Sequence, residues 1–236
     1  MNTVNQVMAA LKKKGSAQTR KTYERHGVSC DVFGVKIGDL KVIAKQIKGN
    51  QELACELYET GNVDAMYLAG IVADGKQMNK RLLNTWAKNA PWHMIAEYTV
   101  PGVAVESGHG RDLAMKWIKS KNTSIACTGW CTYSGVVATV ADDELDLAEI
   151  KDLLKQVEQT IHQTTDQVRC TMNGFVISVG GYVKPLSKAA KAAAKKIGKV
   201  EVNMGDTACK VPLATEYIAK MESAGRAFKK RKTIKC

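Results

Sequence analysis

Apolar residues recur every three or four positions through most of this chain, which is the spacing of an amphipathic helix. Short groups of Gly, Asn and Asp, such as Gly49-Asn50 and Gly61-Asn62, separate the repeats and are typical of helix caps and turns. Alternation typical of a strand appears only at residues 199–202. The pattern predicts helices over residues 4–11, 40–47, 53–58, 66–73, 82–87, 113–118, 125–140, 150–161, 168–183 and 213–221.

Helices of this length joined by short turns predict an all-α fold, in which antiparallel helix pairs stack into a solenoid. The helix pairs do not resemble one another in sequence, so helix length alone supports this architecture. With 236 residues and 45% hydrophobic content, the chain can bury a substantial core. We expect a single domain over residues 1–225, followed by a basic arm over 226–236.

Positive charge is concentrated in the last quarter of the chain. Residues 184–236 carry fourteen Lys or Arg against four Asp or Glu, a net charge of +10, whereas residues 1–183 carry twenty-one against nineteen, a net charge of +2. The electric field of this concentrated positive charge attracts polyanions, and we expect nucleic acid as the partner. A solubilising, disordered basic tail is the alternative interpretation.

Part of this charge follows a helical spacing. Residues 185–199 predict a helix with proline in its first turn and small apolar residues on one face. At about 3.6 residues per turn its lysines share the other face, which suits a phosphate backbone. The inner face consists of Leu186, Ala190, Ala193 and Ile197. The lysine stripe on the opposite face consists of Lys188, Lys191, Lys195 and Lys199.

A second basic block follows Gly225 and predicts a mobile arm that contacts the DNA backbone. A nuclear localisation signal is the competing interpretation of such a run. The block contains Arg226, Lys229, Lys230, Arg231, Lys232 and Lys235.

Other classes of protein are not supported. The seven cysteines include no Cys-x-x-Cys pair, which argues against a disulfide framework or a zinc ribbon, and Cys127 and Cys131 are interpreted as core residues. No apolar run approaches the roughly eighteen residues of a membrane span. We expect a cytoplasmic protein, associated with the nucleoid if bacterial, with no metal and no cofactor. Gly180-Gly181 indicates a close helix contact, and residues 108–110 a turn.

Several short motifs occur in a fixed order between residues 30 and 220. They are Phe33-Gly34-Val35, residues 40–45, Leu68-Ala69 ahead of Trp86 and Trp92, residues 117–120, and Asn173-Gly174-Phe175. In order and spacing these motifs resemble the AlkD-like DNA alkylation repair family. The resemblance implies a right-handed superhelix of HEAT-like helix pairs whose concave basic face holds duplex DNA. Active members excise cationic alkylated bases, such as N3-methyladenine and N7-methylguanine, by hydrolysing the glycosidic bond.

The family's catalytic motif is a tryptophan followed four residues later by an aspartate. Alignment on Val100-Pro101 places Glu97 at the aspartate and His93 at the tryptophan. Alignment on Trp92 instead places Ala96 where the carboxylate should be, and both alignments stay open.

Two further family positions also differ in this chain. The later tryptophan becomes Phe175, and the arginine between the two tryptophans becomes Cys127. The resemblance therefore implies a degenerate form of the family's active site.

Hydrolysis of a cationic base requires a group that stabilises positive charge on the sugar, and Glu97 is the candidate. The rings of Trp92, His93 and Phe175 are the candidates for contact with the lesion. The alternative is structural: Glu97 caps or pairs a helix, and Trp92 fills a groove between helices.

Three functions follow from these features. The first is a DNA glycosylase for alkylated bases. The second is a noncatalytic HEAT-repeat protein that recognises bent or branched DNA by shape and charge. The third is a protein-interaction scaffold whose groove accepts an acidic peptide. The oligomeric state stays open.

Overall fold

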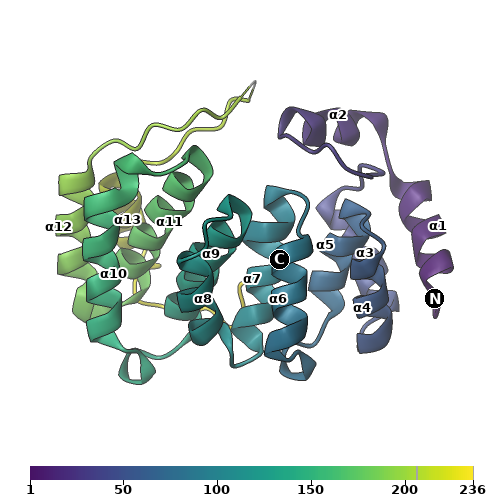
Figure 1. Cartoon of the computed structure of the whole chain (residues 1–236), viewed down its shortest axis with the longest axis horizontal. Coiled ribbons are helices and arrows are strands. Elements are labelled where there is room, and N and C mark those ends of the chain that lie inside the picture. The colour runs from purple at the N-terminus through teal and green to yellow at the C-terminus, as the bar shows by residue number, and fades with distance from the viewer. Residues whose placement is uncertain (206, 236) are drawn as a thin grey trace. The chain divides into compact units, whose positions relative to one another are not determined.

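The computed structural model describes residues 1–205 and 207–235, and it is built from α-helices joined by short turns (Figure 1). No strand occurs in these ranges, and residues 199–202 are irregular. The predicted all-α class is therefore confirmed. No helix within the described ranges combines the length and the apolar character needed to cross a membrane.

The chain divides into two compact units. Unit 1 contains Met1–His109, together with Met204–Ala208 and Lys235, and unit 2 contains Gly110–Asn203 and Cys209–Ile234. The single domain over residues 1–225 stays a prediction.

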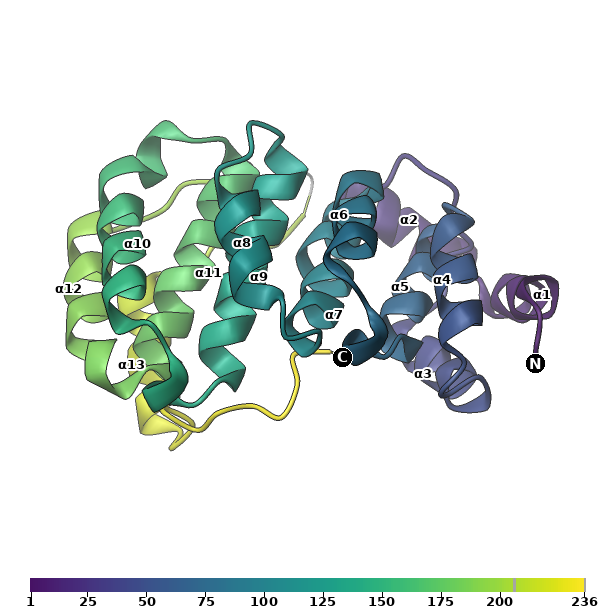
Figure 2. The ribbon, with the colours of Figure 1, turned by 60° about the horizontal axis from the view of Figure 1, so that its bottom comes forward.

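In unit 1 the first helix packs on the third, fourth and fifth, whereas the second buries none of its residues. Figure 2 shows α4 and α5 side by side, and α3 also packs on α5. A π-helical turn, Ile95–Thr99, leads directly into the last helix of the unit. The helices are α1 (Val4–Lys14), α2 (Ala17–Arg25), α3 (Ile37–Gln46), α4 (Gln51–Glu59), α5 (Val63–Val72), α6 (Lys80–Asn89) and α7 (Val100–Glu106).

The loop between α2 and α3 is held by one buried carboxylate. Asp64 accepts hydrogen bonds from the backbone N–H groups of Phe33, Gly34 and Val35 at 2.6, 3.0 and 2.9 Å. Burial raises the pKa of Asp64, and the three N–H donors oppose this shift. Gly34 has a φ of 80°, and a Cβ there would lie 2.6 Å from the backbone nitrogen of Arg20. Only glycine fits, because both the backbone angle and the space exclude a side chain.

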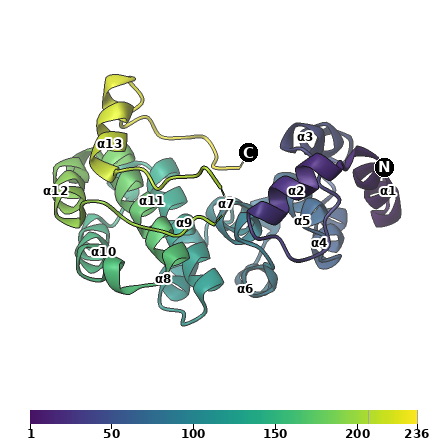
Figure 3. The ribbon, with the colours of Figure 1, turned by 90° about the horizontal axis from the view of Figure 1, so that it is seen from above.

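Unit 2 contains the longest helices of the described chain. Both α8 and α11 pack on α9, while α12 and α13 pack on α11, and Figure 3 shows α13 beside α11 and α12. The helices are α8 (Gly110–Ile118), α9 (Thr123–Thr139), α10 (Leu147–Thr160), α11 (Asp166–Tyr182), α12 (Ser187–Ile197) and α13 (Ala214–Ser223).

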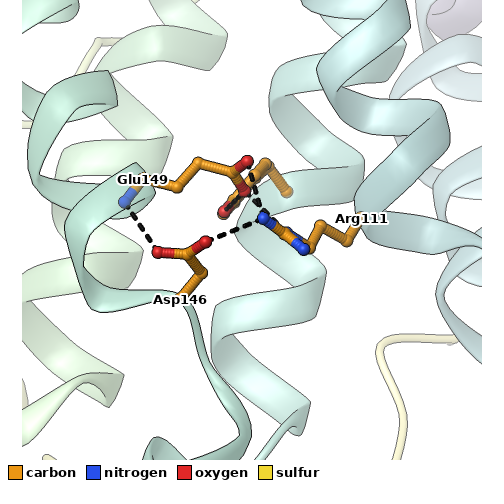
Figure 4. Close-up of polar contacts among 4 residues, drawn as sticks. Arg111, Asp146 and Glu149 are labelled. Carbon is orange, nitrogen blue, oxygen red and sulfur yellow. Dashed lines mark hydrogen bonds and ion pairs between the residues drawn. The ribbon is translucent and has the colours of Figure 1, made fainter.

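Arg111 of α8 fixes the start of α10 through two carboxylates (Figure 4). Its Nε lies 2.8 Å from Glu149 Oε1, and its Nη2 lies 2.9 Å from Glu149 Oε2 and from Asp146 Oδ2. The hydroxyl of Tyr133 also donates to Glu149, and Asp146 caps α10 by accepting the Glu149 N–H at 3.0 Å. The guanidinium holds the pKa of Glu149 below its usual value. The hydrogen bonds and ion pairs of this network join α8, α9 and α10.

Two adjacent glycines let α11 and α13 approach closely. Gly180 lies against Ile218 and Gly181 against Met221, with no room for a Cβ at either glycine. The close helix contact predicted for this pair is confirmed. Gly108, with a φ of 75°, forms the turn predicted between residues 108 and 110.

Every helix predicted from apolar spacing is present, although the observed ends differ by a few residues. Two helices were not predicted. They are α2, in which no residue is buried, and α7, which follows the π-helical turn.

Candidate functional site

The residues predicted for chemistry in unit 1 lie against the end of α2. Trp92 is 7% exposed, and its indole Nε1–H donates to the backbone carbonyl of His26 at 2.8 Å. The ring of Tyr23 lies 5.2 Å from the Trp92 ring between centroids, tilted by 48°. The ring of His93 meets Trp92 edge-on at 4.9 Å. These contacts join the C-terminal end of α2 to the segment that follows α6.

Glu97 lies one turn after His93, and its Oε2 atom is 3.9 Å from His93 Nδ1. No other polar partner of this carboxylate is found in the ranges that the structure describes. The Glu97 side chain is 16% exposed, and burial raises its pKa to about 7. Burial lowers the pKa of His93, and a hydrogen bond with the backbone of His26 opposes that shift.

The local backbone explains the position of Glu97. Proline at position 101 has no N–H to donate to the carbonyl of Glu97, so the regular α-helical bond cannot form there. The N–H of Val100 instead bonds to the carbonyl of Ile95, which widens the helix into a π turn. Such turns occur frequently at functional sites.

A carboxyl with a pKa near 7 is suited to exchange a proton at neutral pH. It is less suited to stabilise a cation on a sugar, because about half of its population is uncharged at that pH. Trp92 offers little ring surface, and its N–H group is already used within unit 1. The roles predicted for Glu97, Trp92 and His93 stay predictions. Ala96 is buried and cannot supply a carboxylate.

Phe175 lies in unit 2. It is 0% exposed in the core of unit 2, with its ring centroid 5.3 Å from that of Trp130 and 5.6 Å from that of Tyr133. The lesion contact predicted for Phe175 stays a prediction, and in this structure the ring is enclosed by core residues. Cys127, which stands where the family has arginine, is buried in the same core.

The helix α12 has the two faces predicted for it. Lys188 and Lys195 are exposed, and neither has an ion pair within the described ranges. The predicted inner face is buried throughout and consists of Leu186, Ala190, Ala193 and Ile197.

The other two lysines of the predicted stripe already have acidic partners. Lys191 forms an ion pair with Glu222 of α13. Lys199 lies beyond Gly198, where α12 ends, and its Nζ is 2.8 Å from a carboxylate oxygen of Glu201. The positive charge on this surface that has no acidic partner within the described ranges therefore comes from Lys188 and Lys195.

The predicted basic arm is bonded to unit 2 over its main chain (Figure 2, yellow). The N–H of Phe228 donates to the carbonyl of Gly181 at 2.7 Å, and the N–H of Arg231 to the carbonyl of Ala138 at 2.8 Å. The expectation of a mobile arm is therefore wrong for residues 226–234, because these bonds fix the segment against α9 and α11. Residue 236 lies outside the described residues. The exposed basic side chains of the segment are Arg226, Lys229, Arg231 and Lys232.

Two lysines of this segment form ion pairs with acidic residues of the chain itself. Lys230 Nζ lies 2.8 Å from Asp142 Oδ1 and donates to a backbone carbonyl of α9. In unit 1, Lys235 Nζ lies 2.6 Å from Glu106 Oε2. Neither side chain is free to follow a phosphate backbone in this structure.

Two residues beside Trp92 were missed in the sequence, namely Tyr23 and His26. Both belong to α2 or its end, and that helix has no apolar repeat to reveal it. The one local signal is Ser16, an N-cap residue whose hydroxyl accepts the backbone N–H of Thr19 at 3.2 Å.

Comparison with known proteins places these features in a family. A protein of Listeria innocua and one of Listeria monocytogenes, both uncharacterized, are each 33% identical over 226 residues, which cover 93% of this chain and 97% of each relative. A solved structure matches 99% of this chain and 100% of its own, with a TM-score of 0.91 and 38% identity. That protein belongs to a new family related to the HEAT-like repeat DNA glycosylases, with affinity for branched DNA structures. The match confirms the predicted HEAT-like solenoid class.

The family model described as DNA alkylation repair enzyme matches residues 7–198, which is most of the chain. Together with the two relatives, this match agrees with the resemblance found in the short motifs. The chain therefore belongs to the DNA alkylation repair enzyme family.

Proposed function

We propose that this protein binds branched or bent DNA and recognises it by shape and charge, without excising a base. The observation that carries the proposal is the match over 99% of the chain to a protein with affinity for branched DNA structures. A HEAT-like surface of this kind contacts the phosphate backbone, and the preference for a branch comes from the geometry that the DNA already has.

The distribution of charge supports this proposal. Residues 184–236 carry a net charge of +10, and Lys188 and Lys195 of α12 are exposed and unpaired within the described ranges. Four further basic side chains after α13 are exposed. Uncompensated lysines on an ordered helix bind phosphates without a further entropic cost for the backbone, because the backbone that carries them is already ordered.

The state of the candidate catalytic residues favours binding without chemistry. Glu97 is largely enclosed and has a pKa of about 7, so it carries only part of a charge at neutral pH. Phe175 is enclosed in a core, and Trp92 is held by its bond to His26. The arrangement therefore offers neither a fully ionised carboxylate nor two open rings for a cationic base.

Excision of cationic alkylated bases, such as N3-methyladenine and N7-methylguanine, is the second candidate function. The specific observation in its favour is Glu97, a largely enclosed carboxyl with a raised pKa beside His93. Perturbed titratable groups of this kind cluster at functional sites. Its ligand would be alkylated duplex DNA.

One set of measurements separates these functions. We expect tighter binding to a four-way DNA junction than to a linear duplex of equal length, and no release of base from methylated duplex above the spontaneous rate. Equal affinity for the two DNAs would contradict recognition of shape. Release of N3-methyladenine or N7-methylguanine would establish the second candidate instead.

A matched pair of variants tests the α12 surface. Lys188→Ala with Lys195→Ala should flatten the dependence of log affinity on log salt by about two units, since each phosphate contact contributes about 0.9. The control is Lys151→Ala with Lys155→Ala on α10, which removes two lysines from another exposed face of unit 2, one of which, Lys155, is paired with Asp152. An equal loss in both variants would mean that α12 has no special role.

A further inference from the structure

A second basic region lies at the start of the chain, in unit 1. Residues 1–48 carry ten Lys or Arg against three Asp or Glu, a net charge of +7. Residues 49–183 carry eleven against sixteen, a net charge of −5. The small net charge of residues 1–183 therefore conceals a strongly basic beginning followed by an acidic middle.

The helix α2 presents much of this charge to solvent. None of its residues is buried, and Figure 1 shows it lying across one end of the other helices of unit 1. Arg20, Lys21 and Arg25 are exposed, and none of them has an ion pair in the described part of the chain. Lys12 and Lys13, at the end of α1, are exposed and unpaired in the same sense.

One face of α2 borders an open hollow of about 550 Å³. Gln18, Lys21 and Arg25 recur at helical spacing along it, and Glu24 contributes its one carboxylate. Two cations on successive turns of a helix suit the repeating charges of a phosphate backbone. The carboxylate of Glu24 opposes them.

The other face of α2 is fixed to unit 1. The Tyr23 hydroxyl donates to the carbonyl of Val35 at 2.8 Å, and its ring packs on Trp92. Trp92 in turn holds the carbonyl of His26, just after the helix. A helix that buries no residue contributes little to a core, so what this anchoring achieves is a fixed position for its exposed charges.

We propose that α2, together with Lys12 and Lys13, is a phosphate-binding surface for DNA on unit 1, in addition to the α12 surface on unit 2. The inference rests on the proposed DNA binding and extends it to a site on the other unit. The ligand is the DNA backbone, because the surface supplies unpaired cations with no apolar patch among them. A branched DNA offers more than one duplex arm for such surfaces.

The test compares two matched pairs of substitutions within unit 1, with the four-way junction as probe. Lys21→Ala with Arg25→Ala removes one lysine and one arginine from α2. Arg81→Ala with Lys88→Ala removes the same two residue types from the exposed face of α6. The α2 pair should flatten the salt dependence of log affinity by about two units, and the α6 pair should leave it at the wild-type value.

A third variant moves affinity in the opposite direction. Glu24→Gln removes the negative charge beside Lys21 and Arg25, and should tighten binding at least about twofold at low salt, an effect that fades as salt screens it. A substitution that merely disturbs the helix would not tighten binding. Melting temperatures of all variants establish that they are folded.

The outcomes separate this inference from the proposed function. A wild-type protein that binds the junction with a steep salt dependence, together with an α2 pair that keeps the wild-type slope, would overturn the α2 surface and leave the proposed function standing. An acidic protein as the true partner of α2 would give that same result. A wild-type protein that binds no DNA would overturn the proposed function itself.

Discussion

The indole N–H of Trp92 donates a hydrogen bond to the backbone carbonyl of His26 across 66 residues of sequence. The bond is 2.8 Å long, and the indole is 7% exposed. It ties the exposed helix α2 to the segment that carries His93 and Glu97. In this structure Trp92 therefore acts as an anchor between two segments of unit 1.

Removal of this anchor should destabilise unit 1. Trp92→Ala deletes the buried ring and is expected to lower the free energy of unfolding by about 3–5 kcal/mol, measured by urea denaturation. Trp92→Phe keeps most of the packing but leaves the carbonyl of His26 without its donor, at a cost of about 1–3 kcal/mol. A Trp92→Ala protein with wild-type stability but no DNA binding would instead show that the ring contacts DNA.

Glu97 should make stability depend on pH. Its pKa is raised from 4.5 to about 7 in the folded protein, so between these values the folded protein holds a proton that the unfolded chain has released. The stabilisation is complete below pH 4.5 and is lost as pH rises through 7. Glu97→Gln removes the charge, and should exceed the wild type in stability above pH 7 by up to about 3 kcal/mol.

The check is a series of urea titrations from pH 4.5 to 8.5 on both proteins. His93 faces Glu97, and its lowered pKa acts in the opposite sense, since neutral His93 is favoured in the fold and stability is lost as pH falls. The difference between variant and wild type is therefore measured again with His93→Gln in both. Parallel stability curves would mean that Glu97 has an ordinary pKa.

Glu97 should also prove dispensable for any chemistry on DNA. We expect wild type, Glu97→Gln and Glu97→Asp to release methylated base from duplex DNA at the spontaneous rate, measured by chromatography of the freed base. A carboxylate that stabilised charge on the sugar would behave differently. Its loss would lower release by about a hundredfold or more, and wild-type activity would rise through about pH 7 as Glu97 ionised.

Neighbouring lysines after α13 should differ in their effect on stability. Lys230 is 22% exposed, pairs with Asp142 and donates to the carbonyl of Val137, so Lys230→Ala should cost about 1–3 kcal/mol. Lys229 is exposed, and Lys229→Ala should stay within about 0.5 kcal/mol of the wild type. Equal and negligible effects in thermal unfolding would restore the interpretation of a free basic arm.

The positions of most helices, and the faces that they bury, follow from the pattern of apolar residues along the chain. Apolar spacing reports whether one side of a helix is enclosed, so Ala190, Ala193 and Ile197 were assigned correctly to the inner face of α12. Gly180 and Gly181 likewise indicated a close helix contact, because a missing Cβ at adjacent positions has a direct spatial meaning. These are local properties, and local patterns predict them.

Which of these residues contact one another is known from the folded chain alone. Helix α2 has no apolar repeat, and its position depends on Tyr23 and His26 reaching Val35 and Trp92. An alignment of motifs placed Phe175 beside a lesion, but burial depends on all the helices that pack around its ring. Apolar spacing along a helix indicates which face is buried, but it does not identify the residues that pack against that face. The partners therefore became known only from the folded chain.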